Sequence, residues 1–336
     1  MDLYRGNCRM SQQPQTARHL GVTTTDTLIP GKTDGIELFL RNKSPANRDV
    51  IGSVLLVHGA TFPSVSLFDV DVGGQSLMDA LALAGIDAWA LDVRGYGGST
   101  RPQRMAEDPG TDEPLVRAVE AVDDVASALD HIRTNHGPVR LGLFGMSWGA
   151  SIAGLYASRQ ARLDALVLAA PLWLSATPLR FDPGAPIATH RNVEVASYRQ
   201  AWLAPVPEDR RATFLPDGWF DRWEEVTEAT DSQAPHGFIR APSGAVADVR
   251  EHWTAGKPLY DPSTITASTL ILRGTLDVDV RRDMALDLFD RLTATSERVY
   301  NEIADSTHML LMEPTRQLAF KQIVGFLTKV FAEPSP

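Results

Sequence analysis

One short segment, 145–149, constrains the fold of this chain more than any other feature. It has the pattern Gly-x-Ser-x-Gly with Ser147 at its centre, between the apolar run 139–144 and the helix-compatible stretch 150–157. A sharp turn from strand to helix needs unusual backbone angles and close approach of the two elements, which a Cβ at either glycine would obstruct. The pattern therefore predicts that Ser147 is an exposed nucleophile on such a turn.

A serine hydroxyl is a poor nucleophile at neutral pH, so it needs a histidine to accept its proton and a carboxylate to orient that histidine. The strand-like run 269–272 leads to Gly274, and Asp277 follows three residues later. A later strand-like run, 298–303, is followed by a polar loop that contains His308. We therefore predict Asp277 as the acid and His308 as the base.

Two further segments carry a family resemblance. An apolar run, 54–57, leads to His58 and Gly59, and residues 92–99 read Asp-x-Arg-Gly-x-Gly-x-Ser. With the three segments above, the chain resembles an α/β-hydrolase-fold serine hydrolase, esterase-like and with a helical cap, over about residues 35–331. The resemblance implies the chain order nucleophile, acid, histidine, which this sequence follows. Segment 92–99 also fits a tight polar turn after a buried strand.

The resemblance also implies an oxyanion hole made of two backbone amides. These are the amide that follows the nucleophile, at Trp148, and an amide after the His-Gly turn, at Ala60. Thr61 is the alternative for the second donor, because this loop departs from the more common glycine-rich version.

Other residues compete for the same roles. Asp279 lies two residues beyond the predicted acid and could replace it, whereas Asp305 is expected to be a loop carboxylate. His131 and His136 fall at the end of a helix-like stretch, where histidines usually interact with the helix dipole. His58 is expected to be a structural member of the oxyanion turn.

Strand-like and helix-like segments alternate from about residue 50, which predicts an α/β fold with a doubly wound, mostly parallel sheet and antiparallel additions at its start. The strand-like runs are 20–29, 36–41, 50–57, 86–91, 139–144, 165–169, 269–272 and 298–303, and the helix-like segments are 75–84, 115–133, 148–159, 280–292 and 315–331.

The alternation breaks once, over about ninety residues with few strand-like runs and five of the seven tryptophans. We predict a flexible segment 1–18, a core in two parts, 19–171 and 261–336, and an inserted helical cap, 172–260, that shapes the substrate pocket. Pocket residues are expected at Thr61, Phe62 and Trp173, although most cap tryptophans would build the cap's own core. A cap arginine could pair with a substrate carboxylate; the candidates are Arg180, Arg191, Arg199, Arg210, Arg211, Arg222 and Arg240.

Composition narrows the class of protein. The chain has 336 residues, 43% of them hydrophobic, and a net charge of -10, which gives no broad basic surface for nucleic acid. It has no long apolar run and no apolar segment typical of a secretory signal at its N-terminus, so we expect a soluble, cytoplasmic protein without stable membrane association. Cys8 is the single cysteine, and the sequence has no metal-ligand spacing or dinucleotide motif, so no cofactor and no metal are expected. The sequence does not fix the oligomeric state.

These features together predict hydrolysis of a small-molecule carboxylic ester through an acyl-enzyme on Ser147. The same triad also serves carbon–carbon bond hydrolases, lactonases, thioesterases and acyltransferases. A different class of interpretation is a non-catalytic ligand-binding protein with an idle triad.

Overall fold

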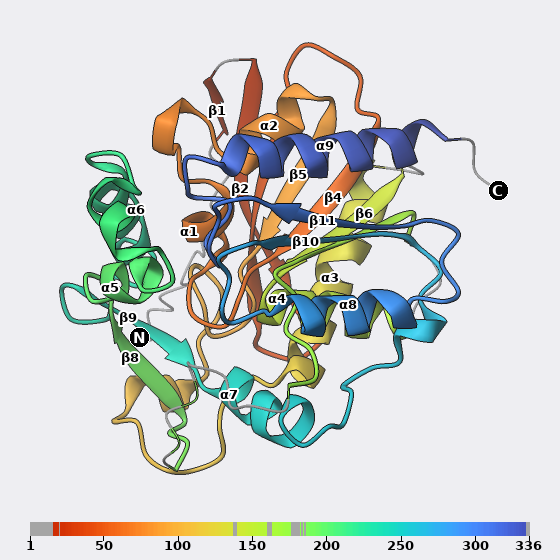
Figure 1. Cartoon of the computed structure of the whole chain (residues 1–336). Coiled ribbons are helices and arrows are strands. Elements are labelled where there is room, and N and C mark those ends of the chain that lie inside the picture. Colours follow the sequence, from red (N-terminus) through yellow and green to blue (C-terminus); the bar gives the residue numbers. More distant parts are fainter. Residues whose placement is uncertain are drawn as a thin grey trace, which may run out of the picture.

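The computed structural model describes residues 16–19, 21–136, 140–159, 163–175, 182, 184 and 186–333. A nine-stranded sheet runs through the middle of this described part, in the order β1-β2-β3-β5-β4-β6-β7-β10-β11 (Figure 1). Its strands are β1 (Thr16–His19), β2 (Val22–Pro30), β3 (Glu37–Pro45), β4 (Gly52–Val57), β5 (Ile86–Leu91), β6 (Leu141–Met146), β7 (Ala165–Ala169), β10 (Ser268–Gly274) and β11 (Arg298–Ile303).

The strands from β5 to β11 in this order pair in parallel, whereas β1, β2 and β3 pair antiparallel at one edge. Every residue of β4, β5, β6, β7 and β10 is buried. Near-continuous apolar strands are typical of a parallel sheet that is covered on both faces. The predicted fold class, a mostly parallel doubly wound sheet with antiparallel additions at its start, is confirmed.

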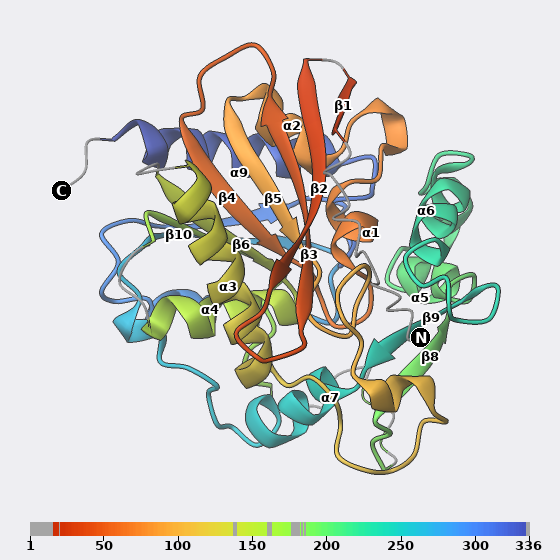
Figure 2. The same cartoon turned by 180° about the vertical axis from the view of Figure 1, so that it is seen from behind.

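Helices cover both faces of the sheet. On one face, α2 (Leu77–Leu83) packs on β5, and α9 (Arg316–Ala332) packs on β7 and β10. On the other face, α3 (Ala118–His136) and α4 (Trp148–Arg159) lie across the central strands (Figure 2). The remaining core helices are α1 (Ser64–Phe68) and α8 (Arg282–Arg291), and 3₁₀ turns occur at Val72–Gly74, Gln103–Ala106 and Pro262–Thr264.

At the N-terminus the structure differs from the expected flexible segment 1–18 in its last residues. Residues 16–19 form β1 and pair with β2. An edge strand leaves a row of backbone donors and acceptors unpaired, and this short segment takes up those of β2. Residues 1–15, which include Cys8, lie outside the described residues.

Residues 172–260, here called the insertion, leave the core after β7 and return before β10. Its described helices are α5 (Tyr198–Leu203), α6 (Trp219–Glu228) and α7 (Gly244–Asp248). A 3₁₀ turn at Glu208–Thr213 and a π-helical turn at Val249–Trp253 add further helical structure. The insertion also holds a two-stranded antiparallel sheet of β8 (His190–Glu194) and β9 (Phe238–Pro242), which the sequence analysis missed. These two strands are short and far apart in the sequence, so no local hairpin pattern connects them.

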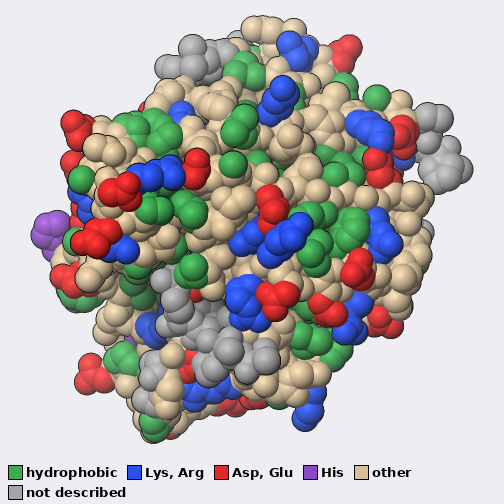
Figure 3. Space-filling model, viewed as in Figure 1, with side chains coloured by type: hydrophobic (Ala, Val, Ile, Leu, Met, Phe, Trp, Pro, Cys, Tyr) green, Lys and Arg blue, Asp and Glu red, His purple; other side chains and the backbone are tan. Residues whose placement is uncertain are grey.

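The insertion lies beside one end of the main sheet, with α5, α6 and the β8–β9 pair grouped together in both views (Figures 1 and 2). On the face shown in Figure 3, acidic and basic side chains are interspersed. Among the described helices, none combines the length and the apolar character that crossing a bilayer requires.

Candidate functional site

The turn from β6 to α4 has the geometry that its glycines predict. Ser147 adopts a left-handed backbone conformation with φ of 57°, and its amide donates to Ala169 O at 2.9 Å. A Cβ at Gly145 would lie 2.2 Å from the carbonyl oxygen of Gly149. A Cβ at Gly149 would lie 2.3 Å from the carbonyl oxygens of two residues at the end of β4. Both glycines are therefore required by close backbone approach.

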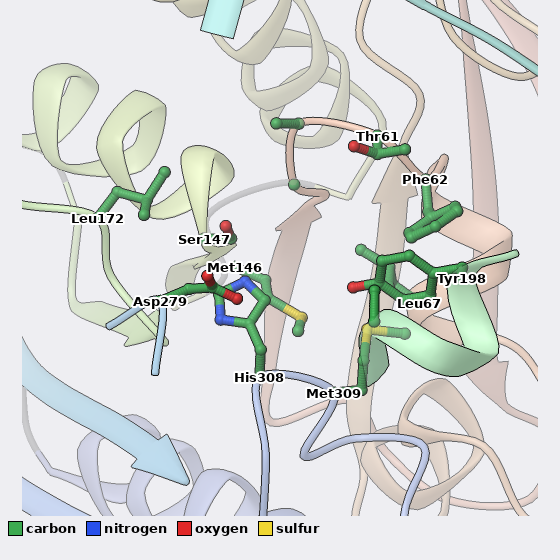
Figure 4. Close-up of a pocket in the computed structure, with 13 residues that line it drawn as sticks. Thr61, Phe62, Leu67, Met146, Ser147, Leu172, Tyr198, Asp279, His308 and Met309 are labelled. Carbon is green, nitrogen blue, oxygen red and sulfur yellow. The ribbon is translucent and has the colours of Figure 1, made fainter. Parts of the chain in front are cut away.

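Ser147 is not exposed on the outer surface as the sequence analysis expected, since only 8% of it is accessible. It opens instead into a cavity of about 330 Å³ that His308 also lines. In Figure 4 the His308 ring is directed toward the Ser147 hydroxyl. The predicted nucleophile and the predicted base therefore share one cavity.

Asp277 and His308 are brought together from the ends of two neighbouring parallel strands, β10 and β11. His308 Nδ1 lies 2.8 Å from Asp277 Oδ2. The other carboxylate oxygen, Oδ1, accepts from the backbone amides of Asp279 and Val280, each at 2.9 Å. The Asp277 side chain is fully buried. Its orientation is therefore fixed by three bonds, as a carboxylate that orients a histidine requires.

Asp279, the alternative acid, also lies in the site. Its carboxylate lines the cavity beside the His308 ring (Figure 4). Asp277, Asp279 and His308 place three potential metal-ligand atoms within 4.8 Å of one another. Because the Asp277 carboxylate is already committed to His308 and two amides, this donor set fits acid–base chemistry better than a metal centre.

The His308 loop is held by a buried carboxyl that the sequence analysis missed. Glu313 is fully buried, and its Oε2 accepts from the Thr307 amide at 2.9 Å. Its Oε1 accepts from the Thr307 hydroxyl and, at 2.8 Å, from Trp202 Nε1 on α5. Burial raises the pKa of the Glu313 carboxyl, against the effect of these donors. Glu313 therefore joins the insertion to the residue next to His308.

The expected oxyanion loop lies directly opposite the turn at Ser147. Gly59, Ala60 and Thr61 all line the cavity, and a Cβ at Gly59 would lie 3.3 Å from that of Ser147. Within the described residues, the hydrogen bonds include none donated by the amides of Ala60 or Thr61. The first amides of α4, Trp148 among them, have no acceptor inside the helix. The amides of Ala60 and Thr61 are therefore both available as the second donor.

His58 has the structural position that was expected of it. It is fully buried, its Nε2 accepts from the Val93 amide at 3.1 Å, and its Nδ1 lies 2.8 Å from the Gly59 carbonyl oxygen. This pattern assigns the ring proton to Nδ1, which donates to Gly59. Burial lowers the pKa of His58, so the ring stays neutral.

Two of the three expected pocket residues line the cavity. Thr61 and Phe62 are among its lining residues, whereas Trp173 is not. The Trp173 ring is fully buried and packs on Tyr260, and its Nε1 donates to Asp287 at 2.7 Å. The indole is thus used for packing. The complete lining set is Gly59, Ala60, Thr61, Phe62, Leu67, Met146, Ser147, Leu172, Tyr198, Ala201, Asp279, His308 and Met309.

Several of these lining residues could not be found from the sequence. Tyr198 and Ala201 come from α5, and nothing local marks that helix as a wall of the site. Met146 and Met309 are different, since each is the direct neighbour of a predicted catalytic residue. Figure 4 shows Phe62, Leu67 and Tyr198 grouped on the side of the cavity away from Asp279. The cavity therefore has one apolar side and one side that carries the reactive groups.

The competing histidines and the arginines of the insertion fall elsewhere. The His131 ring packs edge-on against Trp89, and the side chain of His136 lies outside the described residues, as does Arg180. None of the described arginines lines the cavity. Arg210 pairs with Asp305, Arg222 with Asp71 and Glu225, and Arg240 with Asp231, while Arg211 donates to two backbone carbonyls and Arg199 lies over the Phe220 ring. Arg191 alone of the described set contacts the oxyanion loop, at Ala60 and Thr61.

Comparison with known families gives the site its context. The family described as serine aminopeptidase, S33, matches residues 49–315, which contain the turn at Ser147 and the loops of Asp277 and His308. The chain belongs to that family. It is an α/β-hydrolase-fold serine hydrolase, as the resemblance predicted. No curated protein matches the chain.

Solved structures support the same fold at low sequence identity. A thermophilic esterase from Thermogutta terrifontis has 18% identity and a TM-score of 0.58, with 91% of this chain and 99% of that chain covered. A meta-cleavage product hydrolase from Pseudomonas fluorescens has 17% identity and a TM-score of 0.61, with 90% and 97% covered. A serine hydrolase from Cycloclasticus zankles has 14% identity and a TM-score of 0.60, with 93% of this chain and 100% of that chain covered.

Proposed function

We propose that this protein hydrolyses carboxylic esters of small molecules through an acyl-enzyme on Ser147. The observation that carries the proposal is the hydrogen bond between His308 Nδ1 and Asp277 Oδ2, 2.8 Å long, with His308 lining the same cavity as Ser147. The esterase among the structural relatives agrees with this reaction. The apolar side of the cavity, formed by Phe62, Leu67 and others, suits an uncharged acyl or alcohol group.

In the proposed mechanism, His308 accepts the proton of the Ser147 hydroxyl while its oxygen attacks the ester carbonyl. The amides of Trp148 and of Ala60 or Thr61 stabilise the negative charge that develops on the carbonyl oxygen. His308 then donates its proton to the departing alcohol, which leaves the acyl group on Ser147. Water, deprotonated by His308, attacks this acyl-enzyme and releases the acid. Asp277 stabilises the imidazolium of His308 in both steps.

Residues 172–260 act as a cap in this proposal. Tyr198 and Ala201 of α5 close the cavity on the side of the apolar wall. A covered site excludes water from the reacting groups and limits which esters can enter. We therefore expect a preference for dispersed monomeric esters over emulsified triglycerides.

The test is hydrolysis of a series of p-nitrophenyl acyl esters by the wild type and by Ser147→Ala. We expect kcat to fall by a factor on the order of 10⁶ in the variant, because removal of a triad nucleophile has an effect of that size. Ser158→Ala is the matched control, since Ser158 lies on the same helix, donates to Leu155 O and does not line the cavity. It should retain wild-type turnover.

Each outcome of this test decides something different. Hydrolysis that survives in Ser147→Ala would exclude Ser147 as the nucleophile. A wild type that reacts with a fluorophosphonate at Ser147 but turns over no ester would overturn the ester assignment and favour another acyl substrate, such as the carbon–carbon bond of a ketone. A wild type that does neither would favour the ligand-binding interpretation.

A further inference from the structure

Arg191 on β8 reaches from the insertion into the core at the oxyanion loop. Its Nη2 donates to the Ala60 carbonyl oxygen at 2.6 Å, and its Nη1 lies 3.4 Å from Thr61 Oγ1. Arg240, on the neighbouring strand β9, has an ordinary partner in Asp231 at 2.7 Å. No carboxylate pairs with Arg191 in the part of the chain that the structure describes, and its Nε is buried without a hydrogen-bond partner.

This position is costly for a cation. Burial of a charged group without an opposite charge is unfavourable, and burial lowers the pKa of Arg191 accordingly. An arginine nevertheless stays protonated at neutral pH. Its positive charge is thus placed against the backbone of the oxyanion loop, next to the peptide that the proposed reaction would use.

The loop residue that Arg191 contacts is held from two further directions. Tyr96 Oη also donates to the Ala60 carbonyl oxygen, at 2.9 Å, and His58 Nδ1 donates to the preceding carbonyl, that of Gly59. Both peptide units that flank Ala60 therefore have a fixed carbonyl. In a trans peptide the N–H points opposite to the C=O. The Ala60 amide consequently points away from His58, and the Thr61 amide points away from Tyr96 and Arg191.

We propose that Arg191 is a positioning residue for the oxyanion hole. It holds the Ala60–Thr61 peptide so that a loop amide faces the substrate oxygen, and its charge polarises that peptide toward the developing negative charge. The inference rests on the proposed acyl-transfer function. It also assigns the insertion a part in catalysis beyond shaping the pocket, because β8 carries the residue that holds the loop.

An effect of this kind is confined to the transition state. The negative charge on the carbonyl oxygen is absent in the bound substrate, so loss of Arg191 should lower kcat and leave KM nearly unchanged. Direct removal of one oxyanion donor costs about 10² to 10³ in kcat. Because Arg191 acts through the Ala60 peptide, we expect a loss of about tenfold to a hundredfold for Arg191→Met.

The experiment compares wild type, Arg191→Met, Arg191→Lys and Tyr96→Phe, with Arg222→Met as the control. Arg222 is an exposed arginine of the insertion, paired with Asp71 and Glu225 on the surface. Four quantities are measured: the rate of fluorophosphonate labelling of Ser147, the inhibition constant of a trifluoromethyl ketone, and kcat and KM on the best ester. Thermal unfolding of each variant checks that the fold is intact.

We expect labelling to slow and the inhibition constant to rise together in Arg191→Met, with partial recovery in Arg191→Lys, which keeps the charge. Tyr96→Phe removes the second donor to the same carbonyl and should show a smaller loss, while Arg222→Met should match the wild type. Labelling of Arg191→Met or Tyr96→Phe at the wild-type rate, with an unchanged inhibition constant, would overturn the positioning role. If Ser147 of the wild type does not react with the fluorophosphonate, the proposed function itself fails, and this inference fails with it.

Discussion

The strands of the core and the strands of the insertion differ in how they are covered. All residues of β4, β6 and β10 are buried, whereas β8 has exposed positions along its length. The core strands end in the loops that carry the candidate catalytic residues, and backbone pairing fixes where those loops begin. The insertion, in contrast, contacts these loops through single side chains.

Several side-chain contacts join the two regions, and three of them lie close to the candidate site. Arg191 bonds to the oxyanion loop, and Trp202 bonds to Glu313 beneath the His308 loop. On α7, Asp248 accepts from the indole Nε1 of Trp148, the residue after Ser147. The comparison teaches that the core places the catalytic loops by its backbone, while the insertion adjusts them by polar side chains. Substitutions in the two regions should therefore lower the free energy of unfolding by different amounts.

The largest effect is expected from Gly149→Ala in the core. Its Cβ would lie 2.3 Å from the carbonyl oxygens of Val57 and His58, and backbone at the end of a buried strand cannot move aside. We expect a loss of about 3 kcal/mol or more in the free energy of unfolding, measured by urea denaturation. In the insertion, Gly218→Ala should cost only about 1 to 2 kcal/mol, because its φ of 77° is the sole obstacle and no atom lies within 4 Å. Equal losses for the two variants would contradict the comparison.

A smaller loss is expected from Asp248→Asn at the junction. Asp248 is buried, and besides the Trp148 indole it accepts from the Ala118 amide at 2.9 Å and from Arg117 Nε at 2.7 Å. Removing the charge of one partner in a buried ion pair lowers the free energy of unfolding by about 3 kcal/mol. Glu251→Gln is the control, since Glu251 binds the same arginine at the surface and should contribute less than about 1 kcal/mol. Chemical unfolding of both variants measures the difference, and a loss for Glu251→Gln as large as for Asp248→Asn would refute it.

The smallest effect is a pH dependence at Glu313. Burial raises the pKa of its carboxyl above the usual 4.5, and the charge of Asp277 adds to the rise. The folded protein then retains this proton at pH values where the unfolded chain has lost it. Its stabilising contribution is therefore complete below about pH 4.5 and is lost as the pH rises through the folded-state pKa.

Glu313→Gln cannot ionise and should lack this decline. Between the unfolded-state and folded-state pKa values, we expect the free energy of unfolding of the wild type to fall by up to about 1.4 kcal/mol per pH unit relative to the variant. Urea unfolding of both proteins between about pH 5 and pH 8 measures it. Parallel pH profiles would show that Glu313 titrates at the same pH in the folded and unfolded states.

The core could be predicted from the sequence because its signals are local. The expected strands 86–91, 165–169 and 298–303 match β5, β7 and β11 at both ends, and the expected helix 148–159 matches α4. Apolar runs for a buried sheet and periodic patterns for helices are each contained in one segment. The shared cavity of Ser147 and His308 and the Asp277–His308 bond follow from the order of loops on these strands.

The insertion could not be predicted to the same depth, because its structure depends on partners far along the chain. The pairing of β8 with β9 has no signal in either strand alone. Trp173 was expected in the pocket as a tryptophan of the insertion, yet its indole donates to Asp287 on α8 and does not line the cavity. The contacts of Arg191 and Asp248 with the core likewise depend on tertiary packing, so no local pattern distinguishes Arg191 from the other candidate arginines.

The order of the loops along the chain has a consequence for synthesis. Ser147 lies before the insertion, whereas Asp277 and His308 lie after it, on strands that join the sheet beyond β7. Chains emerge from the ribosome N-terminus first, and domains fold as they emerge. A nascent chain therefore carries its candidate nucleophile long before it has the candidate acid and base, and the proposed hydrolysis can begin only after β11 and the His308 loop have been made.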